Sequence, residues 1–171
     1  ISVISTNSVS KFKFVDFENL QAVNKPFYSL TSSLTFYQSN VHFYNCSFSK
    51  NLKGDDLLNI VRSQFFIENS IFDYSFADAL DIDFAEGSIN NVRFNYCGND
   101  CLDISGSNVD INNIVISHCR DKGISAGENT RLIGSNIKVN SSEIAICSKD
   151  LSLIELNGAI INDSNIGFTA F

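Results

Sequence analysis

The sequence lacks several features that define common classes of protein. It has no Met, no Trp, a single Pro and only 18% charged residues. No apolar run approaches the roughly 18 residues that a membrane-spanning helix needs, so we expect no membrane insertion. Acidic residues outnumber basic ones by 19 to 12, which gives a net charge of −7. Because binding to phosphate backbones needs clustered Lys and Arg, nucleic acid is not expected as a partner.

The five cysteines follow no familiar metal-binding or disulfide framework. No CxxC pair occurs, and the odd count leaves at least one Cys without an intrachain partner. Cys97 and Cys119 are separated by one period of the chain's internal repeat, and we expect them to stack, either as a disulfide or as reduced thiols that pack like small apolar groups. Cys101 and Cys147 are expected to face outward. Cysteine usage therefore leaves the cellular compartment open.

What the sequence does contain is an internal repeat with a period of about 22 residues, in the range typical of solenoids. One apolar series, spaced by this period, consists of Leu80, Leu102, Ile124, Ile146 and Phe168. Between such positions apolar and polar residues alternate with a period of two, which predicts strands, and no stretch sustains the helical period of 3.6. A single coil of this length cannot bury its own inner face, so successive coils must stack. The repeat therefore predicts a solenoid.

We predict an all-β fold, a single-stranded right-handed parallel β-helix with three sides and about 22 residues per coil. Its handedness follows from the strong preference of parallel crossovers. A polar ladder is expected at the corners because Asn tolerates left-handed backbone; its members are Asn45, Asn69, Asn91, Asn113 and Asn136. Residues 1–171 form one domain, with regular coils over 34–171 and an irregular first coil over 1–33. We expect this domain to be part of a longer protein.

Acidic residues recur where one strand of each coil begins. Alternation places Asp81, Asp83 and Asp103 on the outer face, since Leu80 and Ile82 point inward. Asp81 and Asp103 are one coil apart, so their strands should lie about 4.8 Å apart. Carboxylates held this close either raise a pKa or recruit a cation.

Asp78, Asp100 and Lys122 form a neighbouring ladder at the entry corner, where Lys122 can neutralise Asp100. Three interpretations follow. Asp81, Asp100 and Asp103 are the candidate catalytic acids and bases of a glycan-cleaving enzyme. Asp78, Asp81 and Asp103 are the candidate ligands for calcium, the expected metal, which prefers oxygen. The third interpretation is structural, with Asp capping turns and blocking lateral pairing of sheets. The candidate ligand-binding residues are Asp83, Ser105, Lys122 and Ser125.

The coil pattern over residues 34–171 resembles the pectate-lyase-like superfamily of right-handed β-helix proteins. Four tracts resemble the terminal coils of bacterial β-helix repeat proteins of unassigned activity: Asp78–Asp83, Gly98–Gly106, Asp121–Glu128 and Lys149–Ser152. The resemblance implies extracellular polysaccharide lyases, hydrolases, esterases or tailspikes, with calcium common in the lyases. The Asn-Thr-Asp and Gly-His-Gly motifs of polygalacturonases are absent, and no Arg matches the catalytic Arg of pectate lyases.

Three functions are consistent with this resemblance. The first is a carbohydrate-recognising module outside the cell or on a cell or particle surface, with a polysaccharide or glycan as partner. The second is a polysaccharide lyase or glycoside hydrolase that uses the outward Asp cluster. The third is a structural stalk or fibre segment, whose ends meet flanking coils or domains of the same protein or other copies in an oligomer. Fold resemblance does not decide between them.

Overall fold

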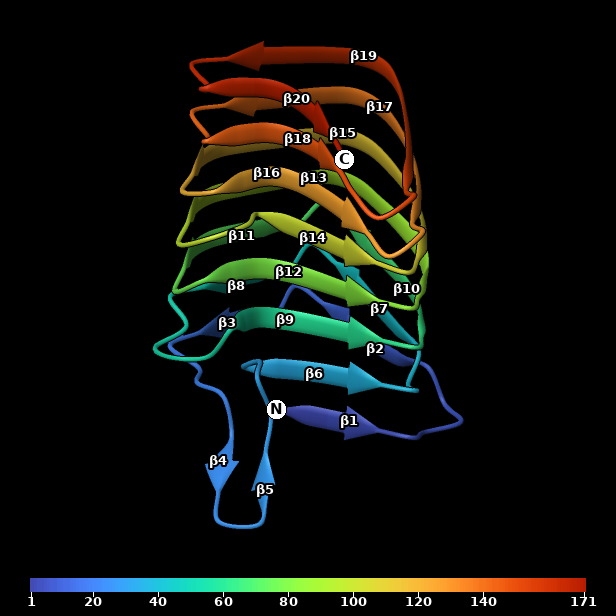
Figure 1. The fold of residues 1–171 in the computed structure, drawn as a ribbon. Helices are drawn as coiled ribbons and strands as arrows, with labels where there is room; N and C mark the ends of the chain where they lie inside the picture. The colour runs from blue at the N-terminus through green and yellow to red at the C-terminus, as the bar shows by residue number, and fades with distance from the viewer.

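The segments in which apolar and polar residues alternate form two sheets of parallel strands, which enclose a shared core. A computed structural model describes residues 1–171; it is all-β, with about six turns of about 22 residues. In Figure 1 the front strands run from left to right and the rear strands return from right to left as the chain rises. This path is right-handed, as predicted. The chain has no helix long and apolar enough to cross a membrane.

Sheet A forms one side of the solenoid and contains eight strands. They are, in spatial order, β1 (Ser2–Ile4), β6 (Leu34–Tyr37), β9 (Asp56–Val61), β12 (Asp78–Asp83), β14 (Leu102–Ser105), β16 (Lys122–Gly127), β18 (Ile144–Ser148) and β20 (Ile166–Ala170). Strands β12 and β14 pair in register exactly one period apart, so that Leu80 lies beside Leu102. The predicted inward series is therefore a ladder down this sheet.

Sheet B forms the other two sides, with ten strands. They are β2 (Ser10–Lys13), β3 (Asp16–Glu18), β7 (Val41–Tyr44), β8 (Ser47–Ser49), β10 (Gln64–Glu68), β11 (Ile71–Ser75), β13 (Glu86–Cys97), β15 (Asn108–Cys119), β17 (Arg131–Asn140) and β19 (Leu153–Asn162). From β13 onward one long strand per coil covers both sides, because it bends at a corner residue without losing its pairing.

Each coil turns three corners, and a residue with left-handed backbone stands at each. The predicted Asn ladder is one of them, with φ of 51–54° from Asn45 to Asn136. Its amides also bond along the axis: Asn91 Nδ2 donates to Asn69 at 2.6 Å, and Asn113 Nδ2 donates to Asn91 at 2.9 Å. The ladder therefore supplies both the backbone conformation and a contact between coils.

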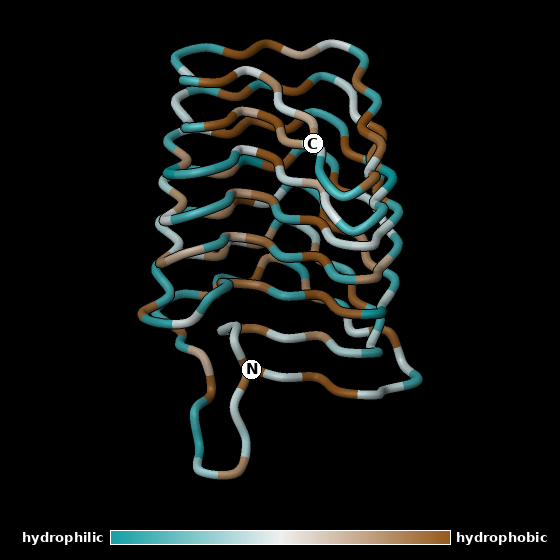
Figure 2. The backbone as a smooth tube through the Cα atoms, viewed as in Figure 1, coloured by the Kyte–Doolittle hydropathy of each residue, from teal (hydrophilic) through white to brown (hydrophobic).

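The core is a set of apolar ladders enclosed by the two sheets, and Figure 2 shows hydrophobic and hydrophilic residues alternating along the coils. Stacked phenylalanines run through its lower half, with Phe17 on Phe48, Phe48 on Phe72 and Phe72 on Phe94, at ring-centroid distances of 5.1, 4.5 and 4.9 Å. The segment 1–33 adds one coil, because β1, β2 and β3 pair with β6, β7 and β8. The irregular excursion expected there is the hairpin of β4 (Asn24–Lys25) and β5 (Tyr28–Ser29).

Candidate functional site

The outward polar residues of sheet A line up across three coils, as the alternation predicted. Asn59 pairs with Asp81, and Asp81 pairs with Asp103. Asp83 pairs with Ser105 in the adjoining ladder. We call these five residues the acidic face. The three Asp and Ser105 are partly exposed, whereas Asn59 is 6% exposed. A row of hydrogen-bonding groups therefore crosses β9, β12 and β14, and its members on β12 and β14 reach solvent.

Hydrogen bonds hold this row in place. Asn59 Nδ2 donates to Asp81 Oδ2 at 2.6 Å and to Asp83 Oδ2 at 2.9 Å. The backbone N–H of Ile104 donates to Asp103 Oδ1 at 3.0 Å. One oxygen of each carboxyl is thus engaged by the protein, and the other oxygens are available to a ligand.

The acidic face contains a carboxyl group that stays protonated at neutral pH. Burial, and then the nearby charges of Asp56, Asp83 and Asp103, raise the pKa of Asp81 to about 9. Both causes disfavour the charged form, because desolvation and like charges each penalise ionisation. Asp81 can therefore donate a hydrogen bond as well as accept one.

Asp78 and Asp100 are built into the scaffold. Asp78 Oδ1 accepts from the backbone N–H of Asp100 and from Asn99 Nδ2, both at 2.7 Å. Asp100 Oδ1 accepts from the backbone N–H of Lys122 at 2.9 Å, and Lys122 Nζ lies 3.5 Å away, which confirms the expected neutralisation across coils. Burial raises the pKa of Asp78 to about 6 and that of Asp100 to about 7. Each buried carboxyl therefore ties one coil to the next.

This placement separates the predicted catalytic and metal residues. Asp81 and Asp103 adjoin on the acidic face, whereas Asp100 is 3% exposed and bonded to the next coil. The carboxylate oxygens of Asp78, Asp81 and Asp103 do not gather within 4.8 Å of one another; three cysteine sulfurs are the one such group. Calcium takes six to eight oxygen ligands, so these three residues form no ready cage for it.

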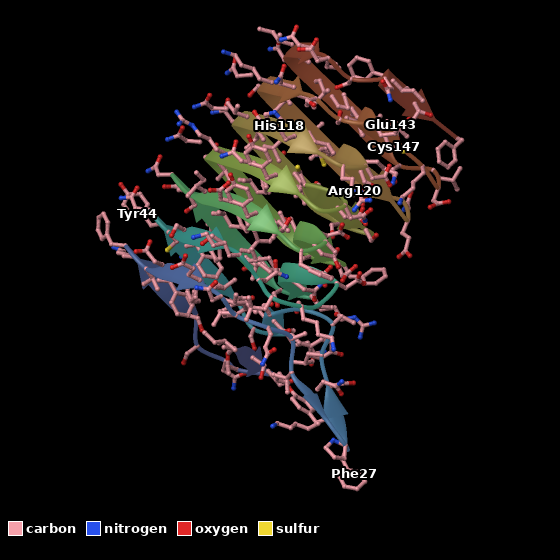
Figure 3. All side chains as sticks on the ribbon, turned by 90° about the vertical axis from the view of Figure 1, so that its left-hand side faces the viewer. Phe27, Tyr44, His118, Arg120, Glu143 and Cys147 are labelled. Atoms are coloured by element: carbon pink, nitrogen blue, oxygen red, sulfur yellow. The ribbon has the colours of Figure 1, made fainter.

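Three outward expectations are wrong because outer positions of sheet A and its entry corner are covered. Ser125 pairs with Asp103 and Cys147 but is fully buried, and its Oγ has no hydrogen-bond partner. Cys147 and Cys101 are also fully buried. Figure 3 shows the side chains around Cys147.

One exposed aromatic residue, Phe84, flanks the acidic face at a corner. Phe84 follows Asp83 directly, is 52% exposed, and has a positive φ of 49°. The Arg62 guanidinium lies 5.8 Å from its ring centroid. A Cβ at Gly106 would come within 2.5 Å of the ring, so the absence of a side chain there makes room for Phe84. Sequence periodicity did not identify this platform, because corner residues vary from coil to coil.

Two other surface features lie away from the acidic face. Tyr74, Tyr96 and His118 stack at 4.7 and 4.5 Å on another corner, so their ring faces cover one another. A cavity of about 410 Å³ opens over β2, β7 and β10, lined in part by Lys11 and His42. Neither contains a predicted site residue.

In comparisons with known proteins, no family model, no curated protein and no solved structure matches this chain.

Proposed function

We propose that the protein is a carbohydrate-binding module that holds a neutral, hydroxyl-rich glycan on the acidic face. The observation that carries the proposal is the row of Asn59, Asp81, Asp83, Asp103 and Ser105 across neighbouring coils, with Phe84 at its end. Sugar hydroxyls both donate and accept hydrogen bonds, and this row offers both functions. An aromatic face beside such polar groups suits the apolar face of a sugar ring.

Charge supports a neutral ligand over an acidic one. The chain has a net charge of −7, and the five residues of the acidic face include three carboxyl groups and no basic side chain, although Arg62 lies against the ring of Phe84. An anionic polysaccharide would therefore be repelled unless a cation bridged it. We also propose that the protein is related to pectate-lyase-like proteins and lies outside the cell. Both points are inferred from the coil pattern.

The test is affinity electrophoresis of the folded protein through gels that contain neutral or acidic polysaccharides, with calcium or with a chelator. We expect retardation by at least one neutral polysaccharide, independent of calcium. Asp103→Ala and Phe84→Gly should each abolish it. Gly suits the positive φ of Phe84, as Gly106 shows at φ 59° one coil later, so this variant removes the ring without straining the corner.

Matched controls lie on sheet B and its corner. Asp110→Ala and Tyr96→Gly remove the same kinds of side chain from exposed positions away from the acidic face, and Gly suits the positive φ of Tyr96 as it does that of Phe84. They should leave the retardation unchanged. Binding that survives both Asp103→Ala and Phe84→Gly would reject the acidic face as the site, and binding only to acidic polymers with calcium would reject a neutral ligand.

A second function, glycan cleavage, is favoured by one observation. The raised pKa of Asp81, about 9, suits a general acid, and Asp103 adjoins it across the strand pair. New reducing ends released from a retarding polysaccharide, and lost in Asp81→Asn, would establish this activity. An unchanged polysaccharide after prolonged incubation would leave binding as the function.

A further inference from the structure

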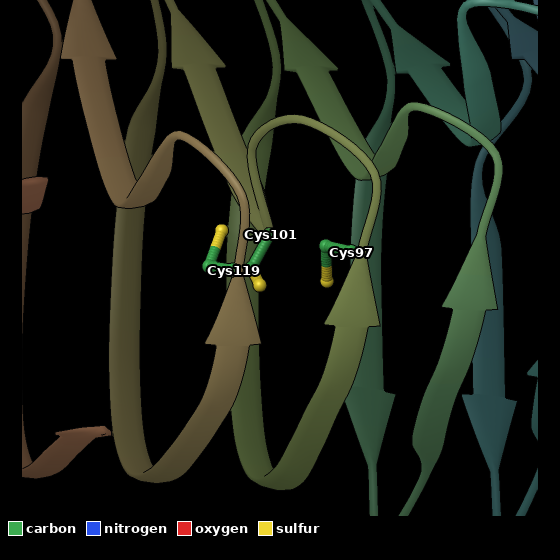
Figure 4. A group of neighbouring side chains, drawn as sticks. All are labelled: Cys97, Cys101 and Cys119. Atoms are coloured by element: carbon green, nitrogen blue, oxygen red, sulfur yellow. The ribbon is translucent and has the colours of Figure 1, made fainter. Parts of the chain in front are cut away.

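Three cysteines from two successive coils meet at one corner of the solenoid. Cys97 ends β13 and Cys119 ends β15, and the two pair directly. Cys101 lies in the turn that precedes β14. Their sulfur atoms all lie within 4.8 Å of one another (Figure 4). The three residues are 3%, 4% and 0% exposed, in the order Cys97, Cys119 and Cys101, so the group is enclosed by the protein.

Packing alone does not require sulfur at this corner. Ser75 pairs with Cys97 one coil earlier and is equally enclosed, at 6% exposed. Ala79 takes the position equivalent to Cys101, one residue before Leu80, which pairs with Leu102. The corner therefore closes with Ser and Ala in a neighbouring coil. Convergence of three sulfurs in the next two coils points to a role beyond filling space.

The thiols surround one another in a way that favours a thiolate. Hydrogen bonds from Cys101 and Cys119 lower the pKa of Cys97 to about 5, against the opposing effect of burial. Burial raises the pKa of Cys101 and of Cys119. Cys119 Sγ also lies within hydrogen-bond distance of the carbonyl oxygens of Lys122, at 2.7 Å, and Asn99, at 3.1 Å.

We propose that Cys97, Cys101 and Cys119 form a three-sulfur site for a thiophilic monovalent cation, Cu(I). Metal–sulfur bonds of about 2.3 Å place three ligands around one ion roughly 4 Å apart, a separation compatible with three sulfurs that all lie within 4.8 Å of one another. Soft thiolate ligands favour Cu(I) and zinc among the first-row metals. Binding is not a redox step, since Cu(I) replaces thiol protons, which pass to solvent.

The number of ligands distinguishes Cu(I) from zinc. No His, Asp, Glu or further Cys joins the three sulfurs within 4.8 Å, so the protein offers three side-chain ligands and no fourth. Structural zinc is almost always four-coordinate, whereas three sulfurs satisfy Cu(I). The remaining cysteines, Cys46 and Cys147, lie outside this group although both are buried.

The test is an anaerobic titration of the fully reduced protein against a chromophoric Cu(I) chelator. We expect transfer of one equivalent of Cu(I) and a new ultraviolet thiolate-to-copper band. Cys97→Ser, Cys119→Ser and Cys101→Ala should each lose both signals. These substitutions copy Ser75 and Ala79, so circular dichroism should show an unchanged fold.

Cys46→Ser and Cys147→Ser are the matched controls and should retain one equivalent of Cu(I). Retention of copper by all three corner variants, or equal loss in the controls, would overturn the assignment. A protein that binds Zn²⁺ but takes no Cu(I) from the chelator would overturn the choice of metal. A disulfide within the group that persists under reductant, seen by mass spectrometry, would overturn the site itself.

Discussion

At the scale of single residues, the regular solenoid contains corner residues with left-handed backbone and carboxyl groups with raised pKa values. Corner positions demand positive φ, and Asn meets that demand at lower cost than most side chains. Phe84 meets it with a ring that stays 52% exposed, at a strain of about 1–3 kcal/mol that the other non-Gly corner residues share. Burial and mutual repulsion raise the pKa of Asp56 to about 8 and that of Asp81 to about 9, so these two carboxyl groups keep their protons at neutral pH.

The protonated carboxyls predict stability that falls as pH rises. Unfolded Asp loses its proton near 3.8, whereas the pKa is raised to about 8 in Asp56 and about 9 in Asp81. The unfolded chain therefore binds fewer protons between about pH 4 and pH 9. The free energy of unfolding should decrease across this range by up to about 1.4 kcal/mol per pH unit for each such group.

Urea unfolding at pH 5 and pH 8 measures this effect. Asp81→Asn keeps a neutral side chain of the same shape at both pH values, so the difference between them should shrink. Asp110→Asn, on an exposed position of β15, is the control and should leave the difference as in the natural chain. Equal differences in the natural chain and in Asp81→Asn would contradict the prediction.

At the scale of strands and ladders, stability comes from equivalent residues stacked along the axis. Phe72 lies between Phe48 and Phe94, with parallel rings 4.5 and 4.9 Å away, and is fully buried. Asp78 and Asp100 add polar ties between coils through backbone amides. The ladders, rather than any local turn, thus hold one coil on the next.

Phe72→Ala should destabilise the protein by about 3–5 kcal/mol, because it removes buried area and leaves a cavity that stacked neighbours cannot close. Phe66→Ala removes a ring of the same size that is 46% exposed on the outer face of β10, and it should cost far less. Denaturant unfolding of both variants checks the comparison. A similar loss of unfolding free energy in Phe72→Ala and Phe66→Ala would contradict the prediction that the buried stack is the more stabilising of the two sites.

At the scale of the whole molecule, contacts join only neighbouring coils. A central strand such as β15 pairs on both sides, with β13 and β17, whereas β1 and β20 each pair on one side. In such solenoids stability is close to a sum of coil and interface contributions. Local opening therefore costs less at the two ends than in the middle.

Hydrogen exchange followed by mass spectrometry should show this gradient. Amides of β13 and β15 are expected to exchange at least about tenfold more slowly than those of β1 and β20, because opening them breaks two interfaces instead of one. Uniform protection along the chain would show a single cooperative unit and contradict the prediction.

The sequence by itself determined the architecture. Alternation with a period of two specifies which side chains of a strand face the core, and the repeat of about 22 residues specifies that strands of successive coils are parallel and in register. Leu80, Leu102 and the Asn ladder lie where the spacing predicted. It also placed Asp81 beside Asp103 and Lys122 beside Asp100. Neighbours in a ladder can be predicted from the sequence of a repeat because their residue numbers differ by a constant interval.

Only the tertiary structure decided burial and contacts between different ladders. Ser125, Cys101 and Cys147 were expected on the surface and are buried. Cys101 joins Cys97 and Cys119 because a corner folds it back onto the coil, and the period of the repeat does not relate Cys97 to Cys101. Phe84 gains its place over Gly106 for a similar reason. Such contacts depend on side-chain size and corner geometry, which the periodic pattern does not encode.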